Sequence, residues 1–332
     1  MKKFRAISVN IFFKLISVSL LLVIIPLVIL GFVGTMSFSN SIQKEAIANM
    51  QSSAENKLDL LRGVVDGVKR EAYASAHNSD ALSILLSAGN VEEIEEMDEI
   101  SAKRQAVGGY LKDLNKQSNE MFENLFFTND KGIVVADADD GNSLGVDISK
   151  RDYFSSAKDT GEIVISDVVV SSSTGNPIMV VVVPLYEDDR FIGMFGMPID
   201  FNRLTELLIK GTEGIDYSYT VFNSEGVVIA YEQKERLFKA NMTSESESQK
   251  ALFEKMQQGE ASYGFYELEG VERIMAYTPY KEQNWYVTTS CLVSDYMRPV
   301  NVFKKVILVL VIIFIIIASV CVFVFSRSIA IP

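Results

Sequence analysis

Two long uncharged apolar segments constrain this chain more than any other feature of its sequence. One is LISVSLLLVIIPLVILGFVGTM at residues 15–36, with 22 residues, and the other is VILVLVIIFIIIASVCVFVF at residues 306–325, with 20. A helix rises about 1.5 Å per residue, so each segment can cross a hydrocarbon layer of about 30 Å. We therefore predict one transmembrane helix near each end of the chain.

Basic residues set the orientation of the first predicted span. Residues 1–14 carry four basic side chains and no acidic one. Such an excess is typical of the cytoplasmic side, so the segment between the spans should lie outside the cytoplasm of a two-pass protein of the cell membrane. Lys304 and Lys305 lie on the outer side, but long translocated segments largely escape the charge rule. A cleaved signal peptide is the alternative; its apolar region of about 7–15 residues is shorter than this one, and no A-x-A site directly follows, which favours an anchor.

The segment between the spans, which we call the ectodomain, is acidic. Residues 37–305 contain all 43 acidic residues and 26 of the 31 basic ones, which gives a net charge of −17. This charge excludes nucleic acid as a partner, because the phosphate backbone requires the opposite sign, and it offers no polybasic patch for anionic lipid. Cys291 is the single cysteine of the ectodomain and Cys321 lies in the second span, so no disulfide is expected within the ectodomain.

A stripe of apolar residues begins the ectodomain. Because no proline occurs in residues 37–90, we predict that the first span continues as a helix for roughly 50 residues beyond the membrane. The stripe has two interpretations, a face packed on the ectodomain and the seam of a homodimer, and we expect both. A second helical stretch completes residues 37–120, and its acidic run at residues 92–99 indicates a solvated surface. The stripe residues follow the three- and four-residue spacing of one helix face: Met50, Ala54, Leu58, Leu61, Val65, Val68 and Ala72.

Strand patterns replace the helical period after residue 121. FENLFFTNDKGIVVAD predicts two strands joined by a turn, and EIVISDVVV, IMVVVVPLY and RFIGMFGMPID predict three more. FNRLTELLIKG then predicts a short helix that is ended by Gly211. The ectodomain therefore combines helices with a strand-rich part.

Part of the strand pattern recurs later in the chain. Residues 128–137 match residues 222–231 at an offset of 94, and residues 178–184 match residues 273–279 at an offset of 95. Two equivalent offsets in the same order indicate two copies of one module in tandem. We place the two modules at residues 121–211 and 212–305.

These features in this order resemble the double Cache sensory domain of bacterial transmembrane chemoreceptors of the methyl-accepting type. The resemblance covers nearly the whole chain: a basic N-terminus, a span, a long helix, two PAS-like modules and a second span. It implies an α+β fold in which a long N-terminal helix precedes two antiparallel-sheet modules, flanked by two transmembrane helices. The terminal SRSIAIP at residues 326–332 resembles the start of a HAMP linker, so we expect a cytoplasmic signalling domain to follow it.

The stretch KRDYF at residues 150–154, in a predicted loop, carries the resemblance to a ligand site. In the amino-acid-binding branch of the family, an arginine holds the ligand carboxylate, and two aromatic residues follow after one intervening position. Arg151, Tyr153 and Phe154 match these positions, with tyrosine in place of tryptophan and phenylalanine in place of tyrosine. A guanidinium presents a planar fork that suits a carboxylate, so the resemblance implies an anion clamp in the membrane-distal module.

The family's site for the ligand ammonium is missing from the matching positions. Two aspartates of the family fall on Ser171 and Pro198, and a tyrosine expected five residues before the arginine falls on Val146. An ammonium buried there would lose hydration without gaining a charged partner, at a cost of several kcal/mol. We therefore expect a small anion or a neutral polar metabolite, such as a short carboxylate or a nucleobase, unless Asp167 or Asp200 reaches the site.

One alternative removes the ligand site altogether. Arg151 would then form a surface ion pair with Asp147 or Asp152 and bind no ligand. The two interpretations differ in where the guanidinium points. The predicted ligand-binding residues are Arg151, Tyr153, Phe154, Asp167, Ser171, Ser173 and Asp200.

Neither catalysis nor a cofactor or metal is expected in the ectodomain. Its one histidine, His77, lies on the predicted long helix, distant in sequence from other candidates, and no P-loop occurs. Asp137, Asp139 and Asp140 loosely resemble a calcium loop, but the distal glutamate of an EF-hand is lacking. These aspartates therefore indicate an acidic turn.

The sequence thus predicts the ligand-sensing half of a membrane receptor. We expect that ligand closes the distal module and displaces the second span relative to the first. A chemoreceptor stands first among the output classes, and a sensor histidine kinase or a cyclic-nucleotide enzyme shares this input half. A further alternative is an ectodomain without a ligand pocket, which recognises a periplasmic binding protein instead.

Overall fold

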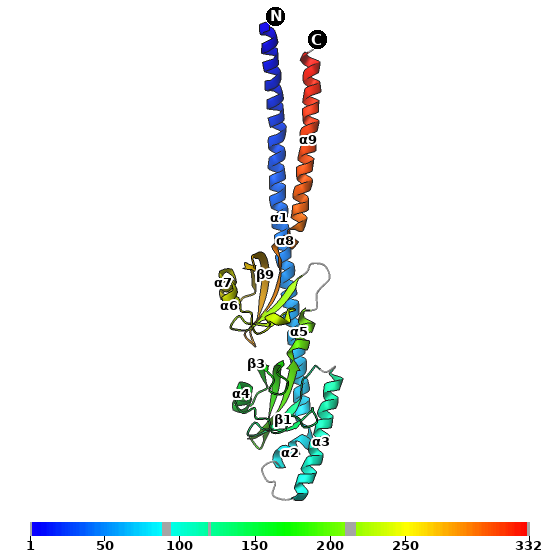
Figure 1. The fold of residues 1–332 in the computed structure, drawn as a ribbon, viewed down its shortest axis with the longest axis vertical. Coiled ribbons are helices and arrows are strands. Elements are labelled where there is room, and N and C mark those ends of the chain that lie inside the picture. Colours follow the sequence, from blue (N-terminus) through cyan, green and yellow to red (C-terminus); the bar gives the residue numbers. More distant parts are fainter. Residues whose placement is uncertain (1, 88–93, 119–120, 210–216, 331–332) are drawn as a thin grey trace. The chain divides into compact units, whose positions relative to one another are not determined.

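The fold is taken from a computed structural model that describes residues 2–87, 94–118, 121–209 and 217–330. The described residues form long helices at both ends of the chain and, between them in sequence, two five-stranded sheets (Figure 1). The predicted α+β fold, with one long N-terminal helix and two antiparallel sheets, is confirmed.

Helix α1, Lys2–Ala76, carries the apolar stripe. All seven stripe residues, from Met50 to Ala72, are buried within this single chain. From Leu58 onward they belong to a hydrophobic core that includes residues of both sheets. The stripe is therefore a face packed on the chain's own core, as predicted, while the homodimer seam stays a prediction.

The long helix ends earlier than the sequence predicts. It ends at Ala76 rather than near residue 90, and α2, Ser79–Ser87, follows a short break. The side-chain oxygen of Asn78 accepts hydrogen bonds from the backbone N–H groups of Asp80 and Ala81, at 3.0 and 3.1 Å. Such a cap satisfies the first amides of a new helix and thereby competes with continuation of the old one.

Helix α3, Ile94–Gln117, is the second predicted helix. Its residues Val107 and Leu111 are buried and join the same core as the stripe. The acidic run at residues 92–99, predicted to be a solvated surface, lies outside the residues whose side chains the structure describes.

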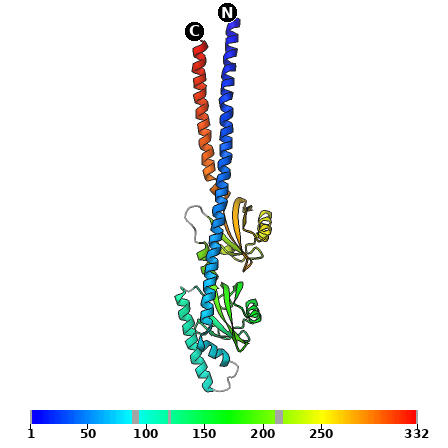
Figure 2. The same cartoon turned by 180° about the vertical axis from the view of Figure 1, so that it is seen from behind.

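The first sheet is antiparallel throughout, with its strands in the order β2-β1-β5-β4-β3. Helices α1 to α3 cover one face and α4 covers the other (Figure 1, Figure 2). Alternate residues reach the two faces: Ile178 of β4 packs under α4, and Met179 packs in the core with α1. A strand buried on both faces needs a continuous apolar run, which explains IMVVVV in β4. The strands are β1 Phe126–Asn129, β2 Val134–Asp137, β3 Val164–Val170, β4 Pro177–Glu187 and β5 Arg190–Asp200.

Helix α4, Asp152–Thr160, was not predicted from the sequence, which placed this region in a loop. Arg151 is its N-cap residue, with an extended backbone at φ −80° and ψ 134°. Gly161 ends the helix in the left-handed conformation, and its N–H donates to the carbonyl of Ala157 at 3.0 Å. Nine residues with few apolar side chains are too short to show a helical period, which explains the wrong prediction.

The second sheet repeats the first. Its strands lie in the order β7-β6-β10-β9-β8, the same arrangement as β2-β1-β5-β4-β3. The two sequence matches fall on equivalent strands, β1–β2 with β6–β7 and β4 with β9, so the predicted pair of modules is confirmed. Gly211, predicted to end α5, lies outside the described residues. The elements are α5 Phe201–Ile209, β6 Ser218–Phe222, β7 Val228–Ala230, the 3₁₀ turn Lys234–Arg236, α6 Met242–Glu245, α7 Glu247–Met256, β8 Ser262–Leu268, β9 Val271–Tyr280 and β10 Trp285–Leu292.

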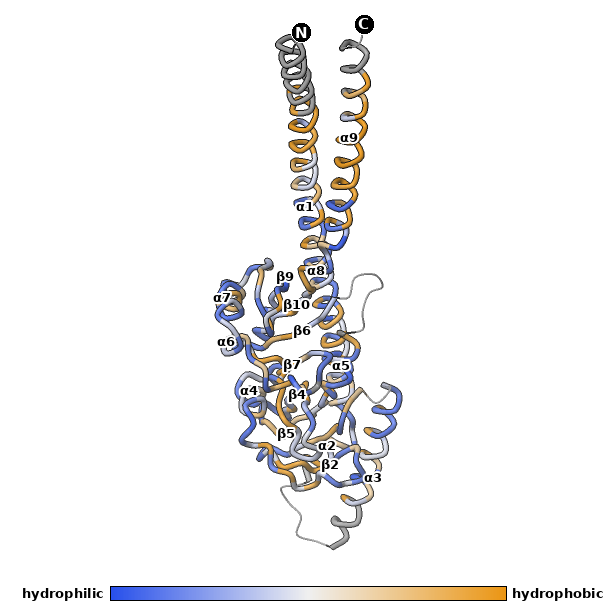
Figure 3. The backbone as a smooth tube through the Cα atoms, turned by 45° about the horizontal axis from the view of Figure 1, so that its top comes forward, coloured by the Kyte–Doolittle hydropathy of each residue, from blue (hydrophilic) through white to orange (hydrophobic). Residues whose placement is uncertain are grey.

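Helices α8, Val293–Tyr296, and α9, Arg298–Ala330, follow β10. In the described residues, two helical segments are long and apolar enough to cross a membrane, Leu21–Ala76 and Arg298–Cys321. Figure 3 shows the apolar stretches of α1 and α9. The two helices touch where the rings of Phe38 and Phe303 lie 4.8 Å apart. Length and composition thus agree with the two predicted spans.

Candidate ligand site

A small cavity lies on the α4 side of the first sheet. Its volume is about 50 Å³, room for a few water molecules at roughly 10–15 Å³ each. Its apolar lining consists of Phe126, Val134, Val146, Ile148, Val169, Ile178 and Pro198. Its polar lining consists of Glu123, Asn124, Ser143, Arg151, Tyr153, Ser171, Ser172 and Ser173.

Arg151 reaches the cavity from the start of α4. Its side chain makes no capping hydrogen bond to the helix. Instead, Nη2 donates to the carbonyl oxygen of Val170 at 3.1 Å and to Oγ of Ser172 at 2.5 Å. The nearby carboxylate of Asp147 accepts a hydrogen bond from the N–H of Ser149 at 2.8 Å. Among the described residues, Arg151 forms no ion pair, so its guanidinium is held against the end of β3.

Tyr153 lines the cavity from the first turn of α4. Its side chain is 6% exposed, and burial raises the pKa of its phenol to about 12, although the charge of Arg151 lowers it somewhat. The phenol therefore stays neutral at physiological pH. A neutral phenol can both donate and accept a hydrogen bond at the cavity wall.

Ser171 and Ser173 line the cavity from the loop after β3. Their hydroxyl oxygens lie 3.1 Å apart, and Oγ of Ser171 accepts hydrogen bonds from the N–H groups of Ser173 and Thr174. With the two residues above, four of the seven predicted positions lie at this cavity. Val146 and Pro198, where the resemblance placed further site positions, line it too.

The other three predicted residues do not line this cavity. Phe154 is buried beneath α4, with its ring centroid 6.0 Å from that of Phe191. Asp167 is exposed on β3. Asp200 caps α5, because its Oδ1 accepts a hydrogen bond from the N–H of Asn202 at 2.9 Å. Strand alternation directs the side chain of Asp167 away from the cavity, and the capping role directs that of Asp200 away from it.

Glu123 lines the cavity, and sequence reasoning missed it. Its N–H donates to the carbonyl of Pro198 at 2.9 Å, which pairs the segment before β1 with β5. Its carboxylate accepts hydrogen bonds from the hydroxyl of Thr174 and from the side-chain amide of Asn176, the latter at 3.4 Å. Burial raises the pKa of Glu123, and hydrogen bonds from Ser171 and Asn176 oppose that rise. Only the pairing with β5 reveals this residue, and no local pattern signals it.

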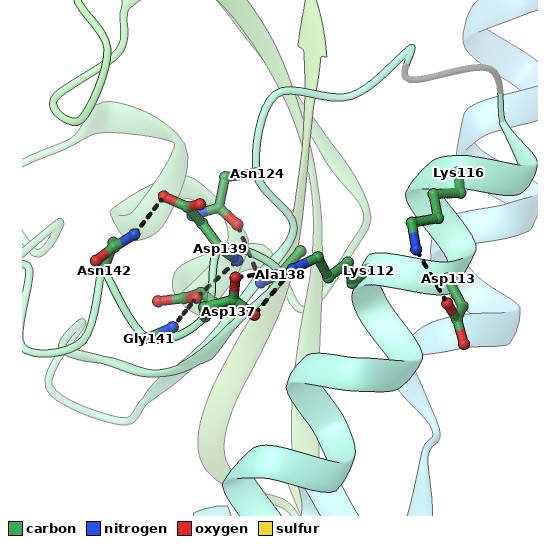
Figure 4. Close-up of polar contacts among 10 residues, drawn as sticks. Lys112, Asp113, Lys116, Asn124, Asp137, Ala138, Asp139, Gly141 and Asn142 are labelled. Atoms are coloured by element: carbon green, nitrogen blue, oxygen red, sulfur yellow. Dashed lines mark hydrogen bonds and ion pairs between the residues drawn. The ribbon is translucent and has the colours of Figure 1, made fainter.

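The loop after β2 is organised by Asp137. Its carboxylate accepts hydrogen bonds from the N–H groups of Asp139 and Gly141 at 2.8 and 2.9 Å (Figure 4). It also accepts a hydrogen bond from the N–H of Ser143 at 2.8 Å. The side-chain amide of Asn124 donates to Oγ of Ser143 at 2.9 Å, so this turn also positions two polar residues of the cavity. Within the described parts of the chain, no group of three or more His, Cys, Asp or Glu residues could hold a metal ion.

A model of the Cache domain family matches residues 38–300. The chain belongs to the Cache domain family. The match runs from α1 to the start of α9, so it includes the long helix and both sheets. The family that the sequence resembles is therefore confirmed.

Proteins similar to this Cache chain in sequence or in fold include kinases and chemoreceptors. Sporulation kinase D of Bacillus subtilis is 24% identical over 238 residues, or 70% of this chain, and the chain spans 40% of that protein's length. The ligand-binding domain of the Campylobacter jejuni chemoreceptor Tlp3 in complex with L-valine is 16% identical, with a TM-score of 0.57 over 78% of this chain and 97% of that one. The sensor domain of the Vibrio cholerae histidine kinase DctB is 15% identical, with a TM-score of 0.59 over 75% and 98%. The two solved domains are sensory rather than catalytic, and their likeness shows the fold.

Proposed function

We propose that this chain is the extracytoplasmic ligand-sensing half of a transmembrane signalling receptor, and that a small anionic or polar metabolite binds at Arg151. The supporting observation is a guanidinium held at a cavity that is lined by both apolar and polar side chains. A hydrogen bond to a charged group is worth about 1.5–3 kcal/mol, which gives the arginine a large share of a small ligand's affinity. Short carboxylates, nucleobases and other small polar metabolites are the proposed ligand classes.

The size of the cavity implies a conformational change on binding. A volume of about 50 Å³ is far below the roughly 300–1,000 Å³ of ordinary ligand sites, so α4 or the loop after β3 must move outward. A ligand that binds the rearranged form more tightly shifts the population toward it. The chain runs from β10 through α8 directly into α9, so a rearrangement of the sheets can be passed to the second span. A coupling of about 1–3 kcal/mol between ligand binding and the position of that span is sufficient.

The proposed output is a chemotaxis signalling domain reached through a HAMP linker. The order of spans, long helix and Cache modules supports this class. A sensor histidine kinase is the second candidate, supported by the match to sporulation kinase D and by the fold of the DctB sensor domain. Either output would lie on the cytoplasmic side of the membrane.

A homodimer through α1 belongs to the same proposal. The apolar stripe is buried in this chain's own core, so the dimer contact would use another face of α1. Leu60, with 42% exposure, lies on such a face. Sedimentation of the purified chain with Leu60→Asp should then show a shift toward monomer, whereas an unchanged dimer would remove this face from the contact.

A ligand panel tests the proposal. The full chain, purified in detergent, is heated with short carboxylates, amino acids and nucleobases, and the unfolding midpoint is compared with that of Arg151→Ala and of the exposed control Arg190→Ala. We expect stabilisation by members of one class, retained by Arg190→Ala and lost by Arg151→Ala. Equal stabilisation of the wild type and Arg151→Ala would remove Arg151 from the site.

A further inference from the structure

The cavity is lined by charges of both signs, and one loop contacts both of them. Arg151 lies at the start of α4 and Glu123 lies before β1, and both line the cavity. The loop of residues 171–176, sequence SSSTGN, contacts both groups. Its Ser172 accepts a hydrogen bond from the guanidinium, and its Thr174 and Asn176 donate to the carboxylate.

The loop makes with these charges the contacts that a dipolar ligand would make. The Ser172 hydroxyl oxygen stands where a ligand carboxylate would accept from Arg151. The hydroxyl of Thr174 and the amide of Asn176 stand where an ammonium would donate to Glu123. The loop is also braced internally, because the N–H of Ser171 donates to the carbonyl of Asn176 at 2.8 Å.

We propose that the loop of residues 171–176 competes with the ligand for both charged groups, and that Glu123 is the second charged contact of the ligand. This inference rests on the proposed function and specifies its ligand class: a zwitterion that presents a carboxylate to Arg151 and an ammonium to Glu123. It replaces the two aspartates, missing at Ser171 and Pro198, with a carboxylate from the segment before β1.

The energetics of loop displacement favour a zwitterion over a simple anion. A monocarboxylate gives Arg151 a new partner, but displacing the loop takes Thr174 and Asn176 away from Glu123. A half-buried carboxylate without partners is costly. A ligand ammonium restores hydrogen bonds to Glu123 and adds an opposite charge, so the same displacement becomes favourable.

The first measurement concerns the loop alone. Hydrogen–deuterium exchange of residues 171–176 is compared in the full wild-type chain, in Glu123→Gln and in Glu162→Gln, an exposed control in the same module. A neutral acceptor makes weaker hydrogen bonds than a carboxylate, so Glu123→Gln should speed exchange about fivefold and the control should not. Unchanged exchange in Glu123→Gln would contradict the loop's attachment to this residue.

The second measurement concerns the ligand. Common L-amino acids are titrated into the same chains, each beside the carboxylic acid that lacks only its amino group. We expect each amino acid that binds the wild type to bind about tenfold or more tightly than its partner acid, and this preference to fall below about threefold in Glu123→Gln alone.

Three results would count against the inference, and they separate it from the proposed function. Acids that bind as tightly as amino acids, in a manner that depends on Arg151, would overturn the role of Glu123 and leave the proposed function standing. A preference for amino acids that survives Glu123→Gln would have the same meaning. Binding of no compound from either set to the wild type at millimolar concentration would contradict both.

Discussion

The ring of Phe201 meets the ring of Trp285 edge to face, with the centroids 5.8 Å apart and the planes at 85°. Phe201 begins α5, directly after the first sheet, and Trp285 begins β10 in the second sheet. Both side chains are fully buried in one hydrophobic core. This contact therefore joins the apolar cores of the two Cache modules.

Truncation of Phe201 should be strongly destabilising. Removal of a buried aromatic ring costs about 3–5 kcal/mol, from lost transfer energy and from the cavity that is left. We expect Phe201→Ala to lower the free energy of unfolding by that amount, measured by denaturant titration with fluorescence of the single tryptophan. Leu207→Ala on the same helix, where the side chain is 40% exposed, is the control and should cost less than about 1.5 kcal/mol. Equal losses would show that the ring contact adds nothing.

Gly193 should not tolerate any side chain. Its φ is 152°, and a Cβ there would lie 2.0 Å from the carbonyl oxygen of Thr128 on the paired strand β1. Because backbone must move, Gly193→Ala should destabilise the fold by about 3 kcal/mol or more. Gly109→Ala on α3 meets nothing within 4 Å and should instead gain about 0.5–1 kcal/mol. Thermal unfolding midpoints compare the two, and similar midpoints would contradict the close approach of β1 and β5.

The thiol of Cys291 should resist alkylation while the protein is folded. Burial raises its pKa from 9.0 to about 11, with a smaller contribution from Asp295. At pH 8 this shift alone makes the thiolate roughly 100-fold scarcer than in the unfolded chain. Iodoacetamide labelling of a Cys321→Ser chain should be slower by at least that factor and should speed up with rising pH. Labelling at the unfolded rate would show that the thiol reaches solvent.

The same shift has a consequence for stability. The unfolded thiol ionises first as pH rises past 9, because the folded state disfavours the thiolate. The contribution of Cys291 to the free energy of unfolding is therefore complete below about pH 9 and declines toward pH 11. Cys291→Ala should flatten this part of the pH profile.

The proposed topology can be tested by labelling in cells. A cysteine introduced as Asp159→Cys, on the exposed side of α4, should react with a membrane-impermeant maleimide from outside the cytoplasmic membrane. A cysteine introduced as Lys3→Cys should react only after the membrane is permeabilised. Both substitutions are made in a Cys291→Ser, Cys321→Ser background. The reverse pattern would invert the proposed orientation.

Periodic and repeated features could be predicted from the sequence. The spacing of Met50 to Ala72 predicted the buried face of α1, and the repeat offsets predicted a second copy of the strand-rich module, which the structure shows as a second sheet. Features that depend on single polar contacts could not be predicted from the sequence. Asn78 ends α1 by capping α2, and Arg151 begins a helix too short to show a period.

The candidate site was predictable only in part for the same reason. Arg151 and Tyr153 lie in the stretch KRDYF, Ser171 was matched through the family resemblance, and all three line the cavity. Asp167 and Asp200 have the right charge, but strand alternation and a capping role direct them elsewhere. Glu123 reaches the cavity through pairing between segments more than 70 residues apart, which no local pattern encodes.

Calorimetric titration of the Arg151 cavity tests the central claim most directly. The compound with the largest thermal shift is titrated into the full wild-type chain, Arg151→Ala and Arg190→Ala. Loss of one charged hydrogen bond of about 1.5–3 kcal/mol corresponds to roughly 10- to 150-fold in affinity. We expect that loss in Arg151→Ala and less than about a twofold change in Arg190→Ala, and equal affinities in all three chains would contradict a ligand site at Arg151.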